Sequence, residues 1–157
     1  MEMNVKKLAG YIALPLAVGI LSSLLTRGGM EVFRMLDKPP LSPPGWLFPV
    51  VWTILYTLMG ISSYLVDTSG GDSQQITKSL KLYLFQLLVN FLWPVFFFNF
   101  GWYLFSFFWI ILLWILVAWM IKEFEKVSKA AAYLNIPYLI WLTVAAYLNL
   151  GIWLLNR

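Results

Sequence analysis

The chain consists mainly of long apolar runs separated by short polar or charged stretches. A helix needs roughly 20 apolar residues to cross the hydrocarbon of a bilayer. Five runs of about that length occur, at residues 8–25, 46–66, 80–99, 101–121 and 130–155. Their hydrophobicity is continuous rather than alternating, which favours helices over a membrane β-barrel. The pattern therefore predicts an all-α integral membrane protein in which residues 1–157 form one transmembrane domain, a five-transmembrane-helix bundle.

Most of the third run and all of the fourth lie in one stretch without any charge, Leu82 to Ile121. About 40 helical residues at 1.5 Å each would extend roughly 60 Å, twice the hydrocarbon thickness, so the stretch must fold back. The sequence "FNFGW" supplies the break, because Asn and Gly tolerate the left-handed backbone that ends a helix. We expect a tight hairpin that turns at Asn99–Gly101.

The first run follows Lys6 and Lys7 and in that respect resembles a secretory signal peptide. Its end, "ILSSLLTRGG", offers no A-x-A-like cleavage site. We therefore interpret it as a span.

Composition agrees with a membrane protein, since apolar residues make up 61% of the chain, charged residues 11%, and mean hydropathy is +0.79. The net charge of +4 comes without a basic stripe, so we expect it beside lipid headgroups and expect no nucleic-acid partner. The absence of Cys and His excludes disulfides, thiolate chemistry, the usual zinc sites, the Ser-His-Asp relay and the commonest haem ligand. An enzyme built from this sequence would have to use unusual groups.

Five spans place the termini on opposite sides of the membrane, and the basic residues then divide seven to four. The two groups are Lys6, Lys7, Lys78, Lys81, Lys122, Lys126 and Lys129 against Arg27, Arg34, Lys38 and Arg157. The positive-inside rule predicts a cytoplasmic N-terminus and an outside location for the first loop, residues 26–45.

The first loop contains "DKPPLSPPGW", which has four prolines within eight residues. Proline fixes its own φ and pushes the preceding residue toward extended backbone, so this segment is stiff and has little entropy to lose on binding. It is either a lid over one end of the bundle or a rigid linker to the second span. The segment alone leaves both interpretations open.

Several spans carry polar and aromatic side chains at helical spacing. The faces are Gln86, Asn90 and Trp93; Trp52 and Tyr56; and Trp141, Ala145, Asn149 and Trp153. For any one residue the simpler interpretation is packing, because amides join helices, Ala permits close approach and Trp is common at membrane interfaces.

The whole ordered set resembles the translocator protein family, also called tryptophan-rich sensory proteins or peripheral-type benzodiazepine receptors. The stretch "LDKPPLSPPGWLFPVVWTILY" is similar to the family's Leu-x-Lys-Pro, Pro-Pro-Gly-Trp-x-Phe and Trp-x-x-Leu-Tyr pattern. "QLLVNFLWPVFF" is similar to its Gln-Leu-x-x-Asn-x-x-Trp-x-x-Phe-Phe segment, and "IPYLIWLTVAAYLNLGIWLLN" to its Pro-Tyr-x-x-Trp, Ala and Leu-Asn segment. The resemblance covers nearly the entire chain, and the order of the three blocks is very specific.

This resemblance implies a bundle, often dimeric, that binds porphyrins and hydrophobic drug-like ligands in a pocket under the first loop, which would then be a lid. The implied partners are the lipid bilayer, such a small molecule and a second copy of the chain. The implied pocket lining is Phe33, Pro43, Phe48, Trp52, Tyr56, Asn90, Trp93, Trp141, Ala145, Leu148 and Asn149.

A flat macrocycle suits a slot lined by indoles and other rings, with a few amides to orient its polar edge. No cofactor or metal is required, and porphyrin is expected as a ligand. Without His, an iron porphyrin would find only poor axial ligands such as Met or Tyr, so free porphyrin is easier to accommodate than ligated haem.

Two departures from the family pattern bear on ligand choice. Val32 and Phe33 stand where the family usually has a Trp-Tyr pair, which changes the expected lid region. Leu150 and Gly151 stand where the family's sterol-associated pattern has tyrosines, so we expect no strong preference for sterols.

Two functional classes follow from the resemblance: a protein that binds, senses, sequesters or transports porphyrin, and an enzyme that degrades porphyrin with light or oxygen. The first is favoured, because no cluster of acids, bases or metal ligands is visible. In the second, Trp52 and Trp141 would be the catalytic residues. A third class, a small subunit that functions within a complex, also stays open.

Overall fold

The structure is a computed structural model that describes residues 2–157. Its helices are α1 (Val5–Leu25), α2 (Gly29–Met35), α3 (Leu47–Asp67), α4 (Ser73–Pro94), the π-helix η1 (Val95–Asn99), α5 (Tyr103–Glu125), α6 (Lys129–Tyr133) and α7 (Ile136–Asn156). No strand occurs among the described residues. Five segments are long and apolar enough to cross a bilayer: α1, α3, α4 with η1, α5, and α6 with α7. The prediction of an all-α, five-helix membrane bundle is confirmed.

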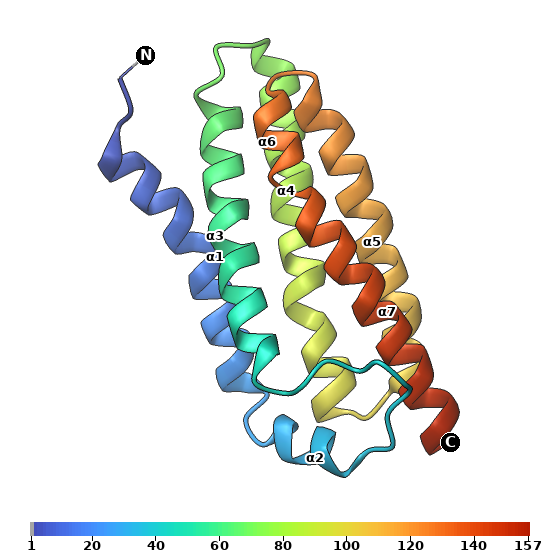
Figure 1. The fold of residues 1–157 in the computed structure, drawn as a ribbon. Coiled ribbons are helices and arrows are strands. Elements are labelled where there is room, and N and C mark those ends of the chain that lie inside the picture. Colours follow the sequence, from blue (N-terminus) through green and yellow to red (C-terminus); the bar gives the residue numbers. More distant parts are fainter. Residues whose placement is uncertain (1) are drawn as a thin grey trace.

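The five long segments stand side by side, with α1 against α3, α4 against α5, and α5 against α7 (Figure 1). The two termini lie at opposite ends of the bundle. The α2 helix and the chain that leads from it to α3 cross the end where the C-terminus lies. We call this the loop end and the opposite one the far end.

Side-chain caps explain where two of the long helices begin. The Asn4 Oδ1 accepts from the Lys7 backbone N–H at 3.0 Å, and the Asp72 Oδ2 accepts from the Gln75 N–H at 3.0 Å. Each cap pairs an amide that has no partner within its own helix and contributes about 1 kcal/mol. Because of the second cap, α4 begins at Ser73 and adds polar turns ahead of the apolar run at residue 80.

The hairpin between α4 and α5 follows a proline. Pro94 ends α4, and the wider π-helix η1 follows at once because proline has no N–H to donate to the preceding turn. Gly101 has φ +64°, the left-handed backbone expected at the break. Asn99 was also expected to adopt left-handed backbone, but that prediction is wrong, because Asn99 is the last residue of η1. Its side-chain Nδ2 instead donates to the Leu25 carbonyl at the end of α1, at 3.0 Å.

The first loop is more regular than expected, because it contains α2. Gly28 has φ +82°, a left-handed conformation that turns the chain after α1. The next residues contain no proline, so a short helix can form, and it buries Phe33 to 5% exposure. Only residues 36–46 remain without a helix between α2 and α3.

The fifth span consists of two helices rather than one. Ser128 caps the short α6, and Pro137 stands in the first turn of α7, where its missing N–H costs nothing. Between them, Asn135 is 1% exposed, and its Nδ2 donates to the Ser62 Oγ of α3 at 2.7 Å. This bond ties the junction to the rest of the bundle.

Candidate functional site

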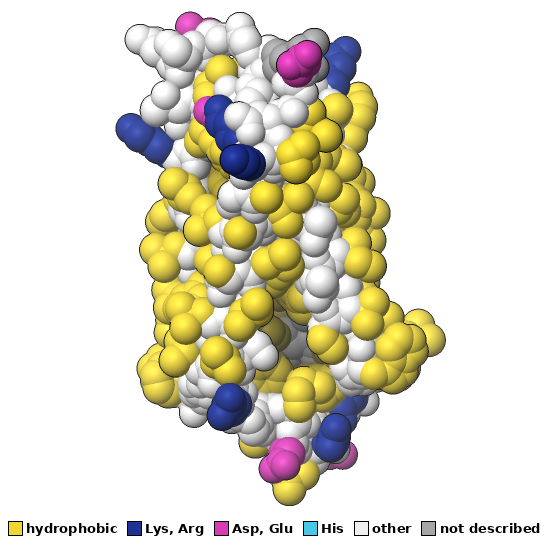
Figure 2. Space-filling view, turned by 90° about the vertical axis from the view of Figure 1, so that its left-hand side faces the viewer, with side chains coloured by type: hydrophobic (Ala, Val, Ile, Leu, Met, Phe, Trp, Pro, Cys, Tyr) yellow, Lys and Arg dark blue, Asp and Glu magenta, His cyan; other side chains and the backbone are white. Residues whose placement is uncertain are grey.

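A cavity of about 1170 Å³ occupies the loop-end half of the bundle. It lies between the second half of α1, the first loop, the first half of α3, the end of α4 with η1, and parts of α5 and α7. Ile20 and Trp46 belong to its lining and yet are 63% and 69% exposed, so the cavity also opens sideways between α1 and α3. Figure 2 shows a hollow near the loop end of this side of the molecule.

All eleven residues that the sequence places in a pocket line this one cavity. The first loop contributes Phe33 and Pro43, and the remaining nine come from α3, α4 and α7: Phe48, Trp52, Tyr56, Asn90, Trp93, Trp141, Ala145, Leu148 and Asn149. Segments more than a hundred residues apart in sequence are thus brought together around one space.

Aromatic rings in mutual contact form one wall of the cavity. The Phe33 ring packs edge-on against Phe48 at 5.5 Å between centroids, and Phe48 packs edge-on against Trp141 at 5.6 Å. Trp52 lies over Tyr56 at 5.4 Å with the ring planes 31° apart. Such contacts hold each ring in place, so the wall is ordered before any ligand arrives.

The two amides of the cavity are bonded within the protein. Asn90 accepts from the Tyr56 hydroxyl at 2.8 Å and donates to the Tyr138 hydroxyl at 2.7 Å. Asn149 accepts from the Trp93 indole N–H at 3.0 Å and donates to the Tyr103 carbonyl at 2.7 Å. Because both ends of each amide are engaged, their part in this structure is to fix the surrounding rings rather than to offer free groups to a ligand.

One polar group of the cavity lining stays unpaired. The Trp141 Nε1 is buried and has no hydrogen-bond partner among residues 2–157. A buried N–H without an acceptor is costly, and native structures leave few of them. A ligand with an acceptor atom beside Trp141 would remove that cost.

The first loop is fastened to α7 across the loop end. The Tyr147 hydroxyl donates to the Pro40 carbonyl at 2.6 Å. The ring of Pro39 lies against Gly151, where it occupies the place that a Cβ would take. Gly151 is one of the residues at which the sequence departs from the sterol-associated pattern, and a tyrosine there would collide with the loop.

Three elements line the cavity without having been predicted from the sequence: η1 with Phe97 and Phe98, α5 with Ile110 and Leu113, and helix α1. In α1, Leu16, Gly19 and Ser22 belong to the lining. A Cβ on Gly19 would overlap the Tyr56 ring, so the glycine lets α1 and α3 approach closely. The small residues at Gly19 and Ser22–Ser23 were the available signal, because membrane helices use such residues where they pack closely.

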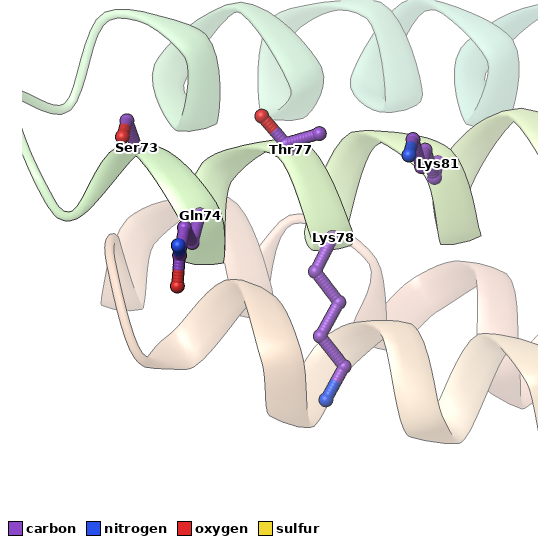
Figure 3. Close-up of a pocket in the computed structure, with 5 residues that line it drawn as sticks. All are labelled: Ser73, Gln74, Thr77, Lys78 and Lys81. Carbon is purple, nitrogen blue, oxygen red and sulfur yellow. The ribbon is translucent and has the colours of Figure 1, made fainter.

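A second hollow, of about 420 Å³, lies on the surface at the far end. Its five lining residues, Ser73, Gln74, Thr77, Lys78 and Lys81, all come from the start of α4, and their side chains point in different directions (Figure 3). Lys78 forms an ion pair with the buried Glu123 at 3.6 Å. A single helix cannot enclose a ligand, so we do not treat this hollow as a site. Residues 2–157 contain no group of three His, Cys, Asp or Glu side chains that could hold a metal ion.

Comparison with known proteins gives consistent matches over nearly the full length. The model of the TspO/MBR family matches residues 11–154. The tryptophan-rich protein TspO of Chlorobaculum tepidum is 38% identical over 157 residues, covering 99% of both chains. The translocator protein of Bos taurus is 37% identical over 153 residues, 94% of this chain and 89% of the relative. Protein CrtK of Rhodobacter capsulatus is 32% identical over 154 residues, 98% and 95% of the two chains.

Proposed function

Because this chain belongs to the TspO/MBR family, we propose that it is a membrane receptor that binds porphyrins and other flat hydrophobic molecules inside its helix bundle. Holding such a molecule would let the protein sense it, sequester it or transport it. The chain is a multi-pass membrane protein, and the ligand would reach the cavity from the bilayer through the opening between α1 and α3.

The observation that carries the proposal is the aromatic cavity itself. Pockets for small molecules usually measure roughly 300–1,000 Å³ and combine apolar walls with a few polar groups. At about 1170 Å³ the cavity is large enough for a macrocycle, and Trp52 and Trp141 both line it. The unpaired Trp141 N–H supplies one polar anchor.

The lining favours free porphyrin over tightly ligated haem. Its candidate axial ligands are Met30 and Tyr56, and the Tyr56 hydroxyl already donates to Asn90. Methionine and tyrosine bind haem iron in some proteins, but His is the common ligand, and this chain has none. We therefore propose a ligand, and no resident cofactor.

Titration of the purified protein with protoporphyrin IX, followed by quenching of tryptophan fluorescence, tests the proposal. Wild type should bind saturably, and Ala145→Phe should bind at least tenfold more weakly because the ring fills the cavity. Ala13→Phe, on the exposed side of α1, is the matched control and should titrate like wild type. Equal affinity in wild type and Ala145→Phe would place the porphyrin elsewhere and contradict the proposal.

An enzyme remains the second candidate, because two electron-rich indoles, Trp52 and Trp141, line the same cavity. Either could donate an electron to an excited porphyrin. Trp52→Phe and Trp141→Phe keep most of the stacking area, so a binding protein should lose only about 0.5–1.5 kcal/mol of affinity. The mass of any product formed under illumination distinguishes the binding protein from the enzyme. A discrete product from wild type, absent in a variant that still binds in the dark, would establish the enzyme.

Two narrower proposals accompany the binding function. We propose that the protein has no strong preference for sterols, since Leu150 and Gly151 stand where the sterol-associated pattern has tyrosines and the Pro39 ring fills the space beside Gly151. We also propose a homodimer, as family resemblance implies. Chemical crosslinking in lipid nanodiscs that contain one or two copies of the chain would test the homodimer, which should give a crosslinked pair only in the discs with two copies.

A further inference from the structure

Helix α1 is the least buried of the five spans. Only Pro15 and Ser22 of its 21 residues are buried, whereas α3 buries eight residues over the same length. The sideways opening of the cavity lies between these two helices, beside Ile20. A ligand that arrives from the bilayer would therefore pass the loop-end half of α1, residues 16–25.

The far-end half of α1 is firmly attached to α3. The Lys7 Nζ pairs with the Asp67 Oδ2 at 2.8 Å. The backbone N–H of Asn4, the residue that caps α1, donates to the Tyr64 hydroxyl at 3.0 Å. The Tyr11 ring packs edge-on against the Tyr64 ring at 6.0 Å between centroids. An ion pair, a hydrogen bond and an aromatic contact thus hold this half of α1 on the last turns of α3.

The loop-end half of α1 is attached on its other side. Its hydrogen bonds to other elements lead from the Ser22 Oγ to the Phe91 carbonyl of α4 at 3.4 Å, and from the Asn99 side chain of η1 to the Leu25 carbonyl at 3.0 Å. Within residues 2–157, no hydrogen bond or ion pair joins residues 16–25 to α3. This half can therefore move away from α3 while it stays bonded to α4 and η1.

A proline separates the two halves of α1. Pro15 has no N–H, so the Tyr11 carbonyl four residues earlier loses the hydrogen bond that residue 15 would otherwise donate, and the helix bends more easily there. At the same level the two backbones touch, because a Cβ on Gly60 of α3 would overlap the Tyr11 carbonyl oxygen and the Ile12 Cα. The helices are thus held at one crossing point, next to the turn of α1 that bends most easily.

Only apolar contact closes the loop-end half of α1 against α3. A Cβ on Gly19 would overlap the Tyr56 ring, so the ring lies directly against the α1 backbone. The Tyr56 hydroxyl donates to Asn90 at 2.8 Å, which fixes the ring in place. Parting Gly19 from this ring breaks van der Waals contacts alone and leaves no polar group unpaired inside the membrane.

We propose that α1 is a side gate, in which residues 16–25 swing away from α3 about Pro15 and the Gly60 crossing point, and so widen the opening to the bilayer. This inference rests on the proposed function and adds how a bulky ligand enters and leaves. The far-end half stays on α3 during the movement, and the bonds to α4 and η1 tether the moving half.

The kinetic test replaces Pro15, which does not line the cavity. In Pro15→Ala the new N–H can donate to the Tyr11 carbonyl, and bending then has to break that bond. Association and dissociation of protoporphyrin IX, followed by stopped-flow tryptophan fluorescence in phosphatidylcholine nanodiscs, should both become about fivefold slower with Kd unchanged.

The matched control is Pro137→Ala, in the first turn of α7 and outside the cavity lining, which should exchange porphyrin like wild type. Wild-type rates in Pro15→Ala would overturn the gate. Slower dissociation alone, with tighter binding, would show an effect on affinity and would also overturn it.

Spin labels measure the movement itself, without a ligand. The chain has no native Cys, so labels at Ile20→Cys and Ile54→Cys follow the loop-end half of α1 relative to α3, and labels at Val5→Cys and Thr68→Cys follow the far-end half. The loop-end pair should give a broad distance distribution that narrows in Pro15→Ala, while the far-end pair stays narrow in both. A single narrow distance for the loop-end pair in wild type would overturn the inference.

A second variant, Gly19→Ala, keeps the test decisive if Pro15→Ala does not fold. Its methyl group would push α1 off the fixed Tyr56 ring, so the loop-end labels should move to longer distances and porphyrin should exchange faster. Unchanged distances in this variant would contradict the gate. No binding of protoporphyrin IX by wild type would overturn the proposed function, and the label distances would still decide whether α1 opens.

Discussion

The side-chain amide of Asn156 forms hydrogen bonds with both backbone groups of Asp37, its N–H and its carbonyl. Its Oδ1 accepts the Asp37 N–H at 3.0 Å, and its Nδ2 donates to the Asp37 carbonyl at 2.8 Å. The two residues are 119 positions apart, so this pair of bonds joins the first loop to the last turn of α7. The proline segment is therefore held at its start as well as stiffened by its own rings.

Replacing Asn156 by Leu should release the first loop while leaving the bundle intact. Leucine has a similar volume but makes neither hydrogen bond, and each is worth about 1 kcal/mol. We expect porphyrin to dissociate several-fold faster, measured by stopped-flow fluorescence. Asn4→Ala removes a helix cap at the far end and should leave dissociation unchanged. Equal rates for Asn156→Leu and wild type would show that this fastening does not control access.

Adding one methyl group at Gly151 of α7 should push against the first loop. The Pro39 ring already occupies the position of the new Cβ, and a ring linked to the backbone cannot easily move away. We expect Gly151→Ala to lower the thermal unfolding temperature of the detergent-solubilised protein. Gly10→Ala, where no atom lies within 4 Å, should be neutral or stabilise by up to about 1 kcal/mol. If Gly151→Ala and Gly10→Ala changed the unfolding temperature equally, the first loop would be free to move away from the new methyl group.

Replacing Pro43 and Pro44 by glycine tests whether the loop is a lid or a linker. Both prolines line the cavity, and glycine adds backbone freedom that must be lost again when a ligand is enclosed. We expect weaker porphyrin binding with unchanged helix content by circular dichroism. Thr68→Gly with Ser69→Gly, in the far-end turn, adds similar freedom away from the cavity and should bind normally. Unchanged affinity in the proline variant would make the segment a linker.

Cysteine labelling tests the five-span topology and its orientation. The chain has no native Cys, so Asn99→Cys at the loop end and Ser128→Cys at the far end can each be labelled alone with an impermeant maleimide. We expect Asn99→Cys to react from outside and Ser128→Cys only from the cytoplasm. The reverse pattern would overturn the orientation alone, whereas reaction of both from one side would contradict five spans.

The parts of the fold that local pattern determines were predictable. The uncharged stretch from Leu82 to Ile121 can only be accommodated by a hairpin, and Gly101 marks where it turns. Helix α2 was missed because nothing in its few residues distinguishes a short helix from a loop. Its stability depends on burial of Phe33 beside Phe48, a contact that no local pattern contains.

The residues that line the cavity were predictable only where the sequence itself marks them. Trp52 and Trp141 stand out in the sequence, and the structure brings both to the cavity lining. Leu16 of α1 is an ordinary apolar residue whose neighbours depend on how α1 leans against α3. The hydrogen bonds of Asn90 could not be predicted either, since its partners Tyr56 and Tyr138 are 34 and 48 residues away in the sequence.

The depth of the cavity has a consequence for the two leaflets of the membrane. Its lining extends along α1 only as far as Leu16 and along α3 only as far as Tyr56, so it ends near the middle of the bundle. Beyond that level Val66 and Phe124, each 0% exposed, fill the space between the helices. A molecule that enters from the loop-end leaflet must therefore return to that same leaflet unless the far half opens. In this conformation the cavity stays within one half of the bundle and does not connect the two leaflets.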